Sequence, residues 1–368
     1  MTITQDGVNS GAQAPRGPVL AIDLGATWTR AAVVSPDGEL VARSAARTPS
    51  DGAPGLLADA VVQVAEQALA AATAAESDPI AAVGVAAVGP LDSRSGVIIA
   101  PPNLGSGYRG LDLATPLRRR FGVPVFVERD TNVAALGEHA YGAARGVDDF
   151  IYLTVSTGLG GAIFSRGRLL TGASGVAGEL GHVPVLLDGP ICGCGGAGHL
   201  EALCSGTAIA RAGREAGIAV RHDAEAGTSA AAYSRGSAEA LASAALRGSA
   251  DAAASADPPA LSAVDVAAAE RAGDERAAAI MRRAREAFAA GVVGFVNVFN
   301  PSLIVVGGGI ARAEGERLLG PARRAIAASA LAPAAAVVTL APAALGDDVG
   351  LMGCVPLTAD GEEASWQR

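Results

Sequence analysis

The sequence predicts a two-domain α/β protein in which one structural pattern occurs twice. The chain has 368 residues, 50% of them hydrophobic, which is enough for two domains that each bury a core. Strand-like and helix-like segments alternate along it, an arrangement typical of helices that cover a mixed sheet. A series of strand, glycine turn, strand and hairpin occurs near the start and again from residue 150. This repetition indicates a duplicated domain, although two unrelated hairpins would give the same local pattern.

The two copies of the pattern can be read in detail. In the first, which begins at Pro18, the strands VLAID and TRAAVV flank the turn LGAT, and a hairpin follows at 36–38. In the second, the strand FIYLTV at 150–155 is followed by the turn STGLGG, the strand AIF and a hairpin at 166–167. The equivalent turns are therefore expected at equivalent places in two related sheets.

The remaining elements follow from apolar periodicity and from cap residues. Asp274 has the character of an N-cap, and its helix is expected to run to about Asn300, where Pro301 ends it. The strand LIVV and a triple glycine follow. Between the two copies, periodicity predicts a helix at 54–72, buried strands at 81–88 and 125–128, and a helix at 132–141.

These elements suggest boundaries for two domains. The Ala/Ser/Gly-rich stretch at 224–259 is interpreted as a low-complexity insertion. The expected organisation is a disordered tail at 1–16, an N-terminal domain at 17–136, a C-terminal domain at 137–346, a helix at about 347–358 that packs back on the N-terminal domain, and a tail at 359–368.

Charge and composition exclude several classes of function. The net charge is -9, and all 28 cationic side chains are arginines that do not gather in a stripe, which disfavours nucleic-acid binding. The absence of lysine excludes the P-loop class of nucleotide enzymes. Neither a signal peptide nor an uninterrupted apolar stretch of roughly 18 residues is present. We therefore expect a cytoplasmic protein with neither nucleic acid nor membrane as a partner.

Two glycine turns are candidate phosphate sites. The first contains Asp23, Gly25, Ala26 and Thr27, and the second is the run from Ser156 to Gly161 that includes Thr157 and Gly158. Glycine lets successive N–H groups converge on an anion, and threonine adds a hydroxyl donor. Each turn alone could be an ordinary tight β-turn. Together, facing each other across a cleft, they could hold a triphosphate from both sides.

A third glycine run follows a buried strand late in the chain. At Gly307, Gly308 and Gly309, the absence of side chains would let a base or ribose lie against the backbone. A Rossmann dinucleotide site is the competing interpretation, but Arg312 occupies the place of the third glycine in the G-x-G-x-x-G motif.

Asp130 is the candidate catalytic base. In the run VFVERDTN it directly follows a buried strand. A carboxylate at a strand end that opens on a cleft can accept the proton of an attacking hydroxyl while Mg²⁺ and the turns hold the leaving phosphates. The alternative is that Asp130 only caps the helix expected from Asn132.

The runs GELGH and CGCGGAGHLE suggest a structural zinc site. His182, Cys192, Cys194 and His199 provide four nitrogen and sulfur ligands, the closed set that structural zinc prefers. Buried free thiols and a surface histidine are the alternative. Glu179 and Glu201 lie among these ligands, where a metal-bound loop at 182–201 could present them to sugar hydroxyls. Elsewhere, His139 is expected to be solvated, and Cys204 and Cys354 to lie in the core.

These motifs together resemble the ROK family of repressors, open reading frames and sugar kinases, in particular its zinc-containing glucokinases and N-acetylhexosamine kinases. GELGH is similar to the family's E-x-G-H, and CGCGGAGHLE to its C-x-C-G-x-x-G-C-x-E. The resemblance covers about Val19 to Pro356. It implies a duplicated actin-like, ribonuclease H-like sugar kinase fold with an interdomain cleft, ATP, Mg²⁺ and structural Zn²⁺, and a homodimer or homotetramer.

The resemblance also implies roles for individual residues. Asp130 would be the catalytic base, and Gly308 and Gly309 would lie beside the adenosine. Sugar contacts would come from Asn103 in APPNL, Arg129, Glu179, His182 and Glu201. The phosphates would be lined by Asp23, Gly25, Ala26, Thr27, Thr157 and Gly158.

Four residues depart from the family pattern. Ala26 replaces a glycine, Trp28 replaces lysine or asparagine, and His199 replaces the third zinc cysteine. Arg129 stands where an asparagine usually contacts the sugar. A guanidinium there is predicted to favour the ionised form of Asp130, and so to weaken its basicity, or to redirect the pocket toward another substrate.

The sequence thus predicts an ATP-dependent sugar kinase, glucokinase-like and acting on the 6-OH of a hexose. The alternatives are an N-acetylhexosamine kinase, a catalytically silent sugar sensor favoured by Arg129 and Trp28, and a repressor of the same family. A repressor would need a helix-turn-helix of roughly 60 residues ahead of the first strand, where only a short polar segment is present.

Overall fold

The computed structural model describes residues 17–49, 54–75, 77–99, 108–219 and 261–359. The tail expected at 1–16, almost all of the tail at 359–368, the insertion at 224–259 and the candidate sugar contact Asn103 lie outside these residues.

The first sheet belongs to the N-terminal half. Its central strand β1 pairs antiparallel with β2 and parallel with β4, because a short glycine turn joins β1 to β2 whereas a helix connects β3 to β4. In spatial order the strands are β3 (Leu40–Arg47), β2 (Trp28–Val34), β1 (Val19–Leu24), β4 (Ala82–Ala87) and β8 (Val125–Arg129).

The second sheet repeats this arrangement. Its central strand β9 pairs antiparallel with β10 and parallel with β12, as β1 does with β2 and β4. In spatial order the strands are β11 (Arg168–Leu169), β10 (Leu159–Ser165), β9 (Phe150–Val155), β12 (Leu303–Gly307) and β13 (Thr339–Pro342). The matching order confirms the predicted duplication, and both glycine turns follow the central strand of their sheet.

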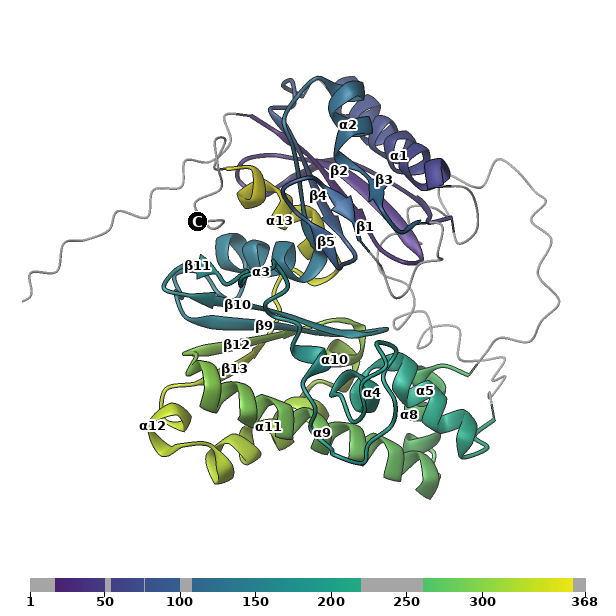
Figure 1. Ribbon diagram of the computed structural model, residues 1–368, viewed down its shortest axis with the longest axis vertical. Coiled ribbons are helices and arrows are strands. Elements are labelled where there is room, and N and C mark those ends of the chain that lie inside the picture. The colour runs from purple at the N-terminus through teal and green to yellow at the C-terminus, as the bar shows by residue number, and fades with distance from the viewer. Residues whose placement is uncertain (1–16, 50–53, 76, 100–107, 220–260, 360–368) are drawn as a thin grey trace, which may run out of the picture.

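Two equivalent helices lie between the sheets. Helix α3 (Asp130–Tyr141) follows β8, and α13 (Val349–Thr358) follows β13 after a 3-10 turn, η3 (Gly346–Asp348). Figure 1 shows the two helices in the middle of the molecule, where they pack against each other. Helix α13 also contacts β1 and β4 of the first sheet. The exact domain boundaries stay predictions.

The other helices cover the outer faces of the two sheets (Figure 1). On the first half these are α1 (Pro54–Ala74) and α2 (Ala114–Phe121), with a small sheet of β5 (Leu91–Asp92), β6 (Val97–Ile98) and β7 (Leu111–Asp112). On the second half they are α5 (Gly206–Glu215), α8 (Ala263–Arg271), α9 (Glu275–Phe299), α10 (Gly309–Glu314), α11 (Glu316–Ser329) and α12 (Ala332–Ala335). The short elements η2 (Leu180–His182) and α4 (Glu201–Cys204) each place a residue at the cavity described below.

Several local predictions are confirmed and others are wrong. Asp274 caps α9 by accepting the N–H groups of Arg276 and Ala277, and Asn300 ends the helix in a left-handed conformation with φ 47°. Helix α3, however, begins at Asp130 rather than near residue 132. His139 is not fully solvated, because its ring stacks on Phe150 with ring centroids 5.7 Å apart.

The apolar core has three parts. One lies between the first sheet and α1, one between the second sheet and α9 and α11, and one between the two sheets around α3 and α13. Cys204 and Cys354 lie in these cores, as predicted. Among the described residues, α1 alone is long and apolar enough to match a membrane span by length and composition. Its residues Leu57, Val61 and Ala68 are buried in the core.

The chain crosses between the two halves at two places, after α3 and before α13. The carboxylate of Glu138, on α3, is fully buried and accepts hydrogen bonds at both of them. Its donors are the N–H of Ala143 at 2.7 Å in the first crossing and the N–H groups of Ala344 and Leu345 at 3.0 Å in the second. A single side chain thus connects both crossings.

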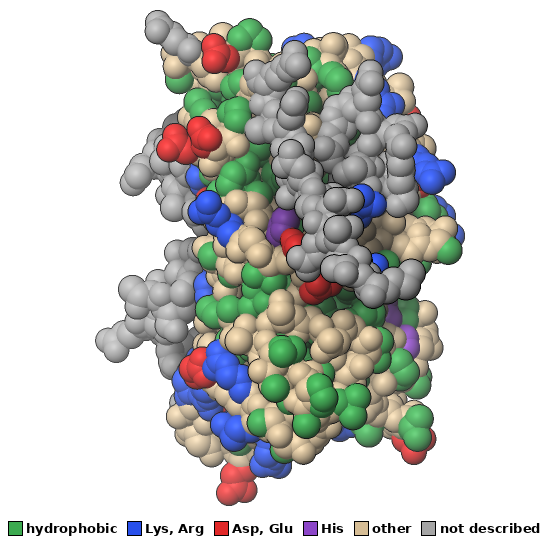
Figure 2. All heavy atoms as spheres, turned by 90° about the vertical axis from the view of Figure 1, so that its left-hand side faces the viewer, with side chains coloured by type: hydrophobic (Ala, Val, Ile, Leu, Met, Phe, Trp, Pro, Cys, Tyr) green, Lys and Arg blue, Asp and Glu red, His purple; other side chains and the backbone are tan. Residues whose placement is uncertain are grey.

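On the surface, side chains of both charge signs are mixed. Figure 2 shows one face of the molecule, on which acidic and basic side chains lie near one another at both ends, with polar and apolar areas between them.

Candidate active site

A cavity of about 500 Å³ opens between the two sheets, lined by residues of both halves. The predicted residues that line it are Asp23, Gly25, Ala26, Thr27, Arg129, Asp130, Thr157, Gly158, Glu179, His182 and Glu201. The structure therefore brings both glycine turns, the carboxylate at position 130 and the two glutamates into one space.

The first glycine turn is held by Thr48, the residue directly after strand β3. The N–H of Gly25 donates to the carbonyl of Trp28 at 3.0 Å, which closes the turn. The buried hydroxyl of Thr48 donates to the carbonyl of Gly25 at 2.8 Å. Because this uses the single hydroxyl proton of Thr48, the hydroxyl of Thr29, 3.0 Å away, is the donor between the two threonines. Sequence reasoning missed Thr48.

Arg30 is a second residue of the first half that sequence reasoning missed. It lines the cavity, forms an ion pair with Asp23 and donates to the carbonyl of Asp347 at 2.7 Å. The charge of Asp23 raises the pKa of Arg30. Arg30 therefore neutralises part of the negative charge beside the first turn.

The second glycine turn is held by main-chain contacts. The N–H of Gly206 donates to the carbonyl of Ser156 at 2.8 Å, and the N–H of Thr207 donates to the carbonyl of Thr157 at 3.1 Å. Across the turn, a Cβ atom on Gly160 would lie 2.6 Å from the side chain of Thr131, so glycine is required where α3 approaches. The start of α5 thus fixes one side of the turn and α3 the other.

Asp130 is the first residue of α3 and lines the cavity. Its Oδ1 accepts the N–H of Thr131 at 2.7 Å. Burial, and then the charge of Asp23, raise the pKa of Asp130 to about 6, although Arg129 acts in the opposite direction. Arg129 thus favours the ionised form of Asp130, as predicted, but desolvation outweighs the guanidinium, so the pKa of Asp130 is raised overall.

Arg129 has its own partners on the opposite half. Its buried guanidinium donates from Nη1 to Oε1 of Glu179 at 2.5 Å and from Nη2 to the carbonyl of Ala177. Nη2 also lies 3.1 Å from Oδ1 of Asn132. Two glycines leave room for the side chain, because a Cβ on Gly89 would lie 3.0 Å from Cδ of Arg129 and one on Gly178 would lie 3.4 Å from its Nη2. The arginine thus connects β8 to the loop that carries Glu179.

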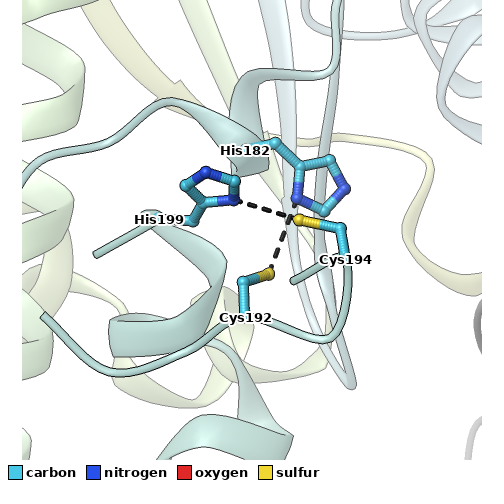
Figure 3. A group of neighbouring side chains, drawn as sticks. All are labelled: His182, Cys192, Cys194 and His199. Carbon is cyan, nitrogen blue, oxygen red and sulfur yellow. Dashed lines mark hydrogen bonds between the residues drawn. The ribbon is translucent and has the colours of Figure 1, made fainter. Parts of the chain in front are cut away.

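The four predicted metal ligands lie together in the loop before α4. Figure 3 shows their side chains pointing toward one another, and their ligand atoms all lie within 4.8 Å of one another. Nδ1 of His182 is 3.6 Å from Sγ of Cys192, and Nδ1 of His199 is 3.2 Å from Sγ of Cys194. In tetrahedral zinc the standard bond lengths separate a nitrogen and a sulfur ligand by about 3.6 Å. The residues present therefore fit a zinc ion.

The metal cluster borders the cavity. Nε2 of His182, on the ring side away from the cluster, lies 3.9 Å from Oε2 of Glu179. Glu201 also borders the cluster, since its Oε1 is 3.5 Å from Sγ of Cys192. Both glutamates that were predicted as sugar contacts are thus next to the cluster.

Gly308 and Gly309 are not among the residues that line the cavity. Gly308 has φ 93°, which favours glycine, and a Cβ there would lie 2.4 Å from the carbonyl oxygen of Val155. Close packing against β9 thus explains this glycine. Its predicted place beside the adenosine stays a prediction.

Two sheets of matching strand order, with a cavity between them that both glycine turns and a strand-end carboxylate line, define the actin-like, ribonuclease H-like two-domain class. The matches with known proteins agree with this fold. The chain belongs to the ROK family, whose family model matches residues 19–360.

Individual relatives match over almost the whole chain. A glucokinase of Thermotoga maritima is 32% identical over 93% of this chain and 98% of its own. The crystal structure of a ROK hexokinase from Thermus thermophilus has a TM-score of 0.68 and 31% identity, covering 92% of this chain and 97% of its own. A ROK glucokinase from Streptomyces griseus, solved in complex with glucose and AMPPNP, has a TM-score of 0.68 and 30% identity, covering 93% of this chain and 99% of its own.

Proposed function

We propose that this protein is an ATP-dependent hexose kinase that transfers the terminal phosphoryl group of ATP to a sugar hydroxyl, glucokinase-like at the 6-OH. One observation carries the proposal: Asp130, with a pKa of about 6, lines the same cavity as both glycine turns. A carboxylate of this pKa is ionised at neutral pH and still basic enough to accept the proton of an attacking hydroxyl. The relatives named above support ATP as the donor and glucose as the acceptor.

The two turns would receive the phosphates of ATP. Thr27 and Gly25 of the first turn, and Thr157 and Gly158 of the second, line the cavity from opposite halves. Phosphoryl transfer depends on positioning and on charge stabilisation, which main-chain N–H groups on both sides can supply. The adenosine is expected beside Gly308 and Gly309.

The charges that line the cavity fit a nucleotide bound with Mg²⁺. Both arginines there, Arg30 and Arg129, are ion-paired with Asp23 and Glu179. The triphosphate therefore needs another cation, and Asp23 is the carboxylate placed to hold it beside the first turn. Mg²⁺ would neutralise the charge that develops on the transferred phosphoryl group.

The sugar is expected at the wall formed by Arg129, Glu179 and His182. Glu179 can accept hydrogen bonds from sugar hydroxyls, while Arg129 holds its Oε1 in place. Zinc at the cluster would fix the orientation of the His182 ring and so present Nε2 to the cavity. We also propose that the protein binds zinc at the cluster, forms a homodimer or homotetramer and is located in the cytoplasm.

A kinase assay tests the proposal. The purified protein would be incubated with ATP, Mg²⁺ and a panel of hexoses while ADP release is measured. Asp130→Asn should lower turnover at least about 100-fold, because a general base contributes that much or more, with little change in sugar affinity. Asp92→Asn, an exposed aspartate outside the cavity, is the matched control. If no sugar stimulates ADP release, and Asp130→Asn behaves as the wild type does, the protein is not a sugar kinase.

A further inference from the structure

Asp347 is a carboxylate of the cavity wall that has no role in the phosphoryl transfer proposed above. It belongs to η3, through which the chain enters α13, and it lines the cavity together with Val349 and Gly350. Its side chain is 32% exposed, and its Oδ1 accepts from Nη1 of Arg312 at 2.8 Å. Its other oxygen, Oδ2, has no donor among the residues that the structure describes. This oxygen is therefore free to accept a hydrogen bond from a ligand.

A series of contacts runs from the first glycine turn through Asp347 to α10. Arg30 forms an ion pair with Asp23 beside the turn and donates from Nη1 to the carbonyl of Asp347 at 2.7 Å. The carboxylate of Asp347 is paired with Arg312 of α10, and the N–H of Arg312 donates to the carbonyl of Gly308 at 3.0 Å. Asp347 therefore lies between the turn proposed to receive phosphate and the glycines expected beside the adenosine.

The order of the groups in ATP matches this order of residues. The ribose joins the phosphates to the adenine, so a side chain between the two subsites faces the ribose. A carboxylate repels phosphate oxygens, but it accepts from hydroxyl groups in charge-assisted hydrogen bonds, which are stronger than neutral ones. Rossmann folds use a carboxylate in this way on the ribose of a dinucleotide. The chemistry of Asp347 thus suits the ribose of a nucleotide rather than its phosphates.

The turn that carries Asp347 is fixed on both sides. Before it, the buried carboxylate of Glu138 accepts the N–H of Leu345 at 3.0 Å. After it, the carboxylate of Asp348 lies 3.4 Å from the guanidinium of Arg43 on β3. A nucleotide that reaches Asp347 therefore meets a backbone that is already in place, so binding loses little free energy to ordering.

Arg312 orients the carboxylate of Asp347. The side chains of this pair are 48% and 32% exposed, so solvent screens their attraction and the pair contributes little to the stability of the fold. The hydrogen bond to Oδ1, however, restricts the rotation of the carboxylate and so the direction of Oδ2. The guanidinium also offsets the charge of Asp347 where a triphosphate would bind. Arg312 thus favours nucleotide binding although it does not itself line the cavity.

We propose that Asp347 binds the ribose of the nucleotide and that Arg312 is a positioning residue that orients its carboxylate. This rests on the proposed kinase function, and it narrows the phosphoryl donor to nucleotides with a complete ribose. A Mg²⁺ ligand and a purely structural ion pair are the competing assignments for Asp347. The three assignments differ in what the loss of a ribose hydroxyl does to binding.

The test is the binding of nucleotides that lack one ribose hydroxyl. Calorimetry with the full chain, in saturating Mg²⁺ and without sugar, would measure the Kd of ADP, 2′-deoxy-ADP and 3′-deoxy-ADP. In the wild type at least one deoxy analogue should bind about tenfold more weakly than ADP, the effect of losing one charge-assisted bond. Asp347→Ala should bind ADP as weakly as the wild type binds that analogue, and should no longer discriminate between the two.

Variants of Arg312 test the positioning role. Arg312→Met should reduce the discrimination to about threefold, because Asp347 is still present but is no longer oriented. Arg312→Lys, which keeps a cation at this place, should restore most of it. Glu316→Ala is the matched control, because it removes the carboxylate of another exposed ion pair, with Arg323, outside the cavity. All three Kd values should be unchanged in this control, and thermal unfolding would establish that each variant folds.

The outcomes separate the two proposals. If wild-type protein binds neither ADP nor ATP with Mg²⁺, the kinase function fails, and the ribose assignment fails with it. If it binds ADP and both deoxy analogues with equal Kd, or if Asp347→Ala keeps the discrimination, only the role of Asp347 fails. If Asp347→Ala raises the Mg²⁺ concentration needed for binding by the same factor for all three nucleotides, Asp347 is a Mg²⁺ ligand and not a ribose contact.

Discussion

The two glycine turns occupy equivalent places in the two sheets but are supported by different means. The turn after β1 is held by a buried hydroxyl, that of Thr48, and borders the ion pair of Asp23 with Arg30. The turn after β9 is held by main-chain groups of α5 and by Glu201, which is connected to the metal cluster. The duplication therefore preserves the strands and the turn, whereas the contacts that stabilise each turn belong to each half separately.

The ends of the last parallel strands differ in the same way. Strand β8 leads directly into α3, so Asp130 is the first helical residue and lines the cavity. Its counterpart β13 is followed by η3, and α13 begins only at Val349. The first half thus provides the Asp130 carboxylate, and the second half provides Glu179 and His182, which line the same cavity.

The largest expected difference between the halves is in the free energy of unfolding after a substitution at the start of α3 or just before α13. Burial raises the pKa of Asp130 from 3.8 to about 6, so its charge opposes folding at neutral pH. Asp130→Asn should therefore increase the free energy of unfolding at pH 7.5 by up to about 3 kcal/mol. The gain should shrink as the pH falls through 6 and vanish below about pH 3.8, where the carboxyl is protonated in both states.

Asp348→Asn is the matched variant in the second half. Asp348 precedes α13, and its carboxylate lies 3.4 Å from Arg43. Because this pair is partly exposed, the substitution should change stability by no more than about 1 kcal/mol in the destabilising direction. Denaturant unfolding at several pH values measures both. Equal effects of the two substitutions would contradict the asymmetry of the two helix starts.

Arg129→Met tests the connection between the halves at the sugar wall. The variant leaves Glu179 and the carbonyl of Ala177 without their donor, which should cost about 1–3 kcal/mol of stability. It also removes a positive charge that lowers the pKa of Asp130. The acid limb of kcat/KM, set by ionisation of Asp130 near pH 6, should therefore move to higher pH. A limb that stays in place, measured from pH 5 to 8, would show that Asp130 does not limit the reaction.

Smaller effects than those of Asp130 and Arg129 are expected from the hydroxyls that support the two turns. Thr48→Val should cost about 1–2 kcal/mol, because Thr48 is buried and both the carbonyl of Gly25 and the hydroxyl of Thr29 lose a partner. Thr207→Val should cost about 0.5 kcal/mol or less, because Thr207 is exposed and its N–H still donates to Thr157. Thermal unfolding of the two variants side by side checks this. A larger loss of stability for Thr207→Val than for Thr48→Val would contradict the expectation that the buried hydroxyl contributes more than the exposed one.

The sequence predicted those features whose signals are local. Each glycine turn, the carboxylate after β8 and the cluster of cysteines and histidines lies within a short run, and its chemistry can be read from neighbouring residues. The duplicated fold followed from the same local pattern found twice. The start of α3 was missed by two residues because Asp130 and Thr131 are weak helix formers that strand β8 and the core hold in place.

The missed features depend on partners far apart in the chain. Thr48 and Gly25 are 23 residues apart, and Arg129 and Glu179 are 50 apart. Nothing near Arg129 in sequence indicates that its charge would be paired or that burial would dominate the pKa of Asp130. His139 was expected in solvent because its aromatic neighbours come from β9 and β10.

The buried carboxylate of Glu138 has a consequence for how the cleft can open. The Glu138 carboxylate accepts hydrogen bonds from both crossings between the halves. The two crossings therefore cannot move apart without breaking these hydrogen bonds. Rotation of one half against the other must then pivot close to this side chain. A small rotation about this point would displace the far rim of the cavity more than the residues next to Glu138, so the buried carboxylate would act as the pivot of any opening.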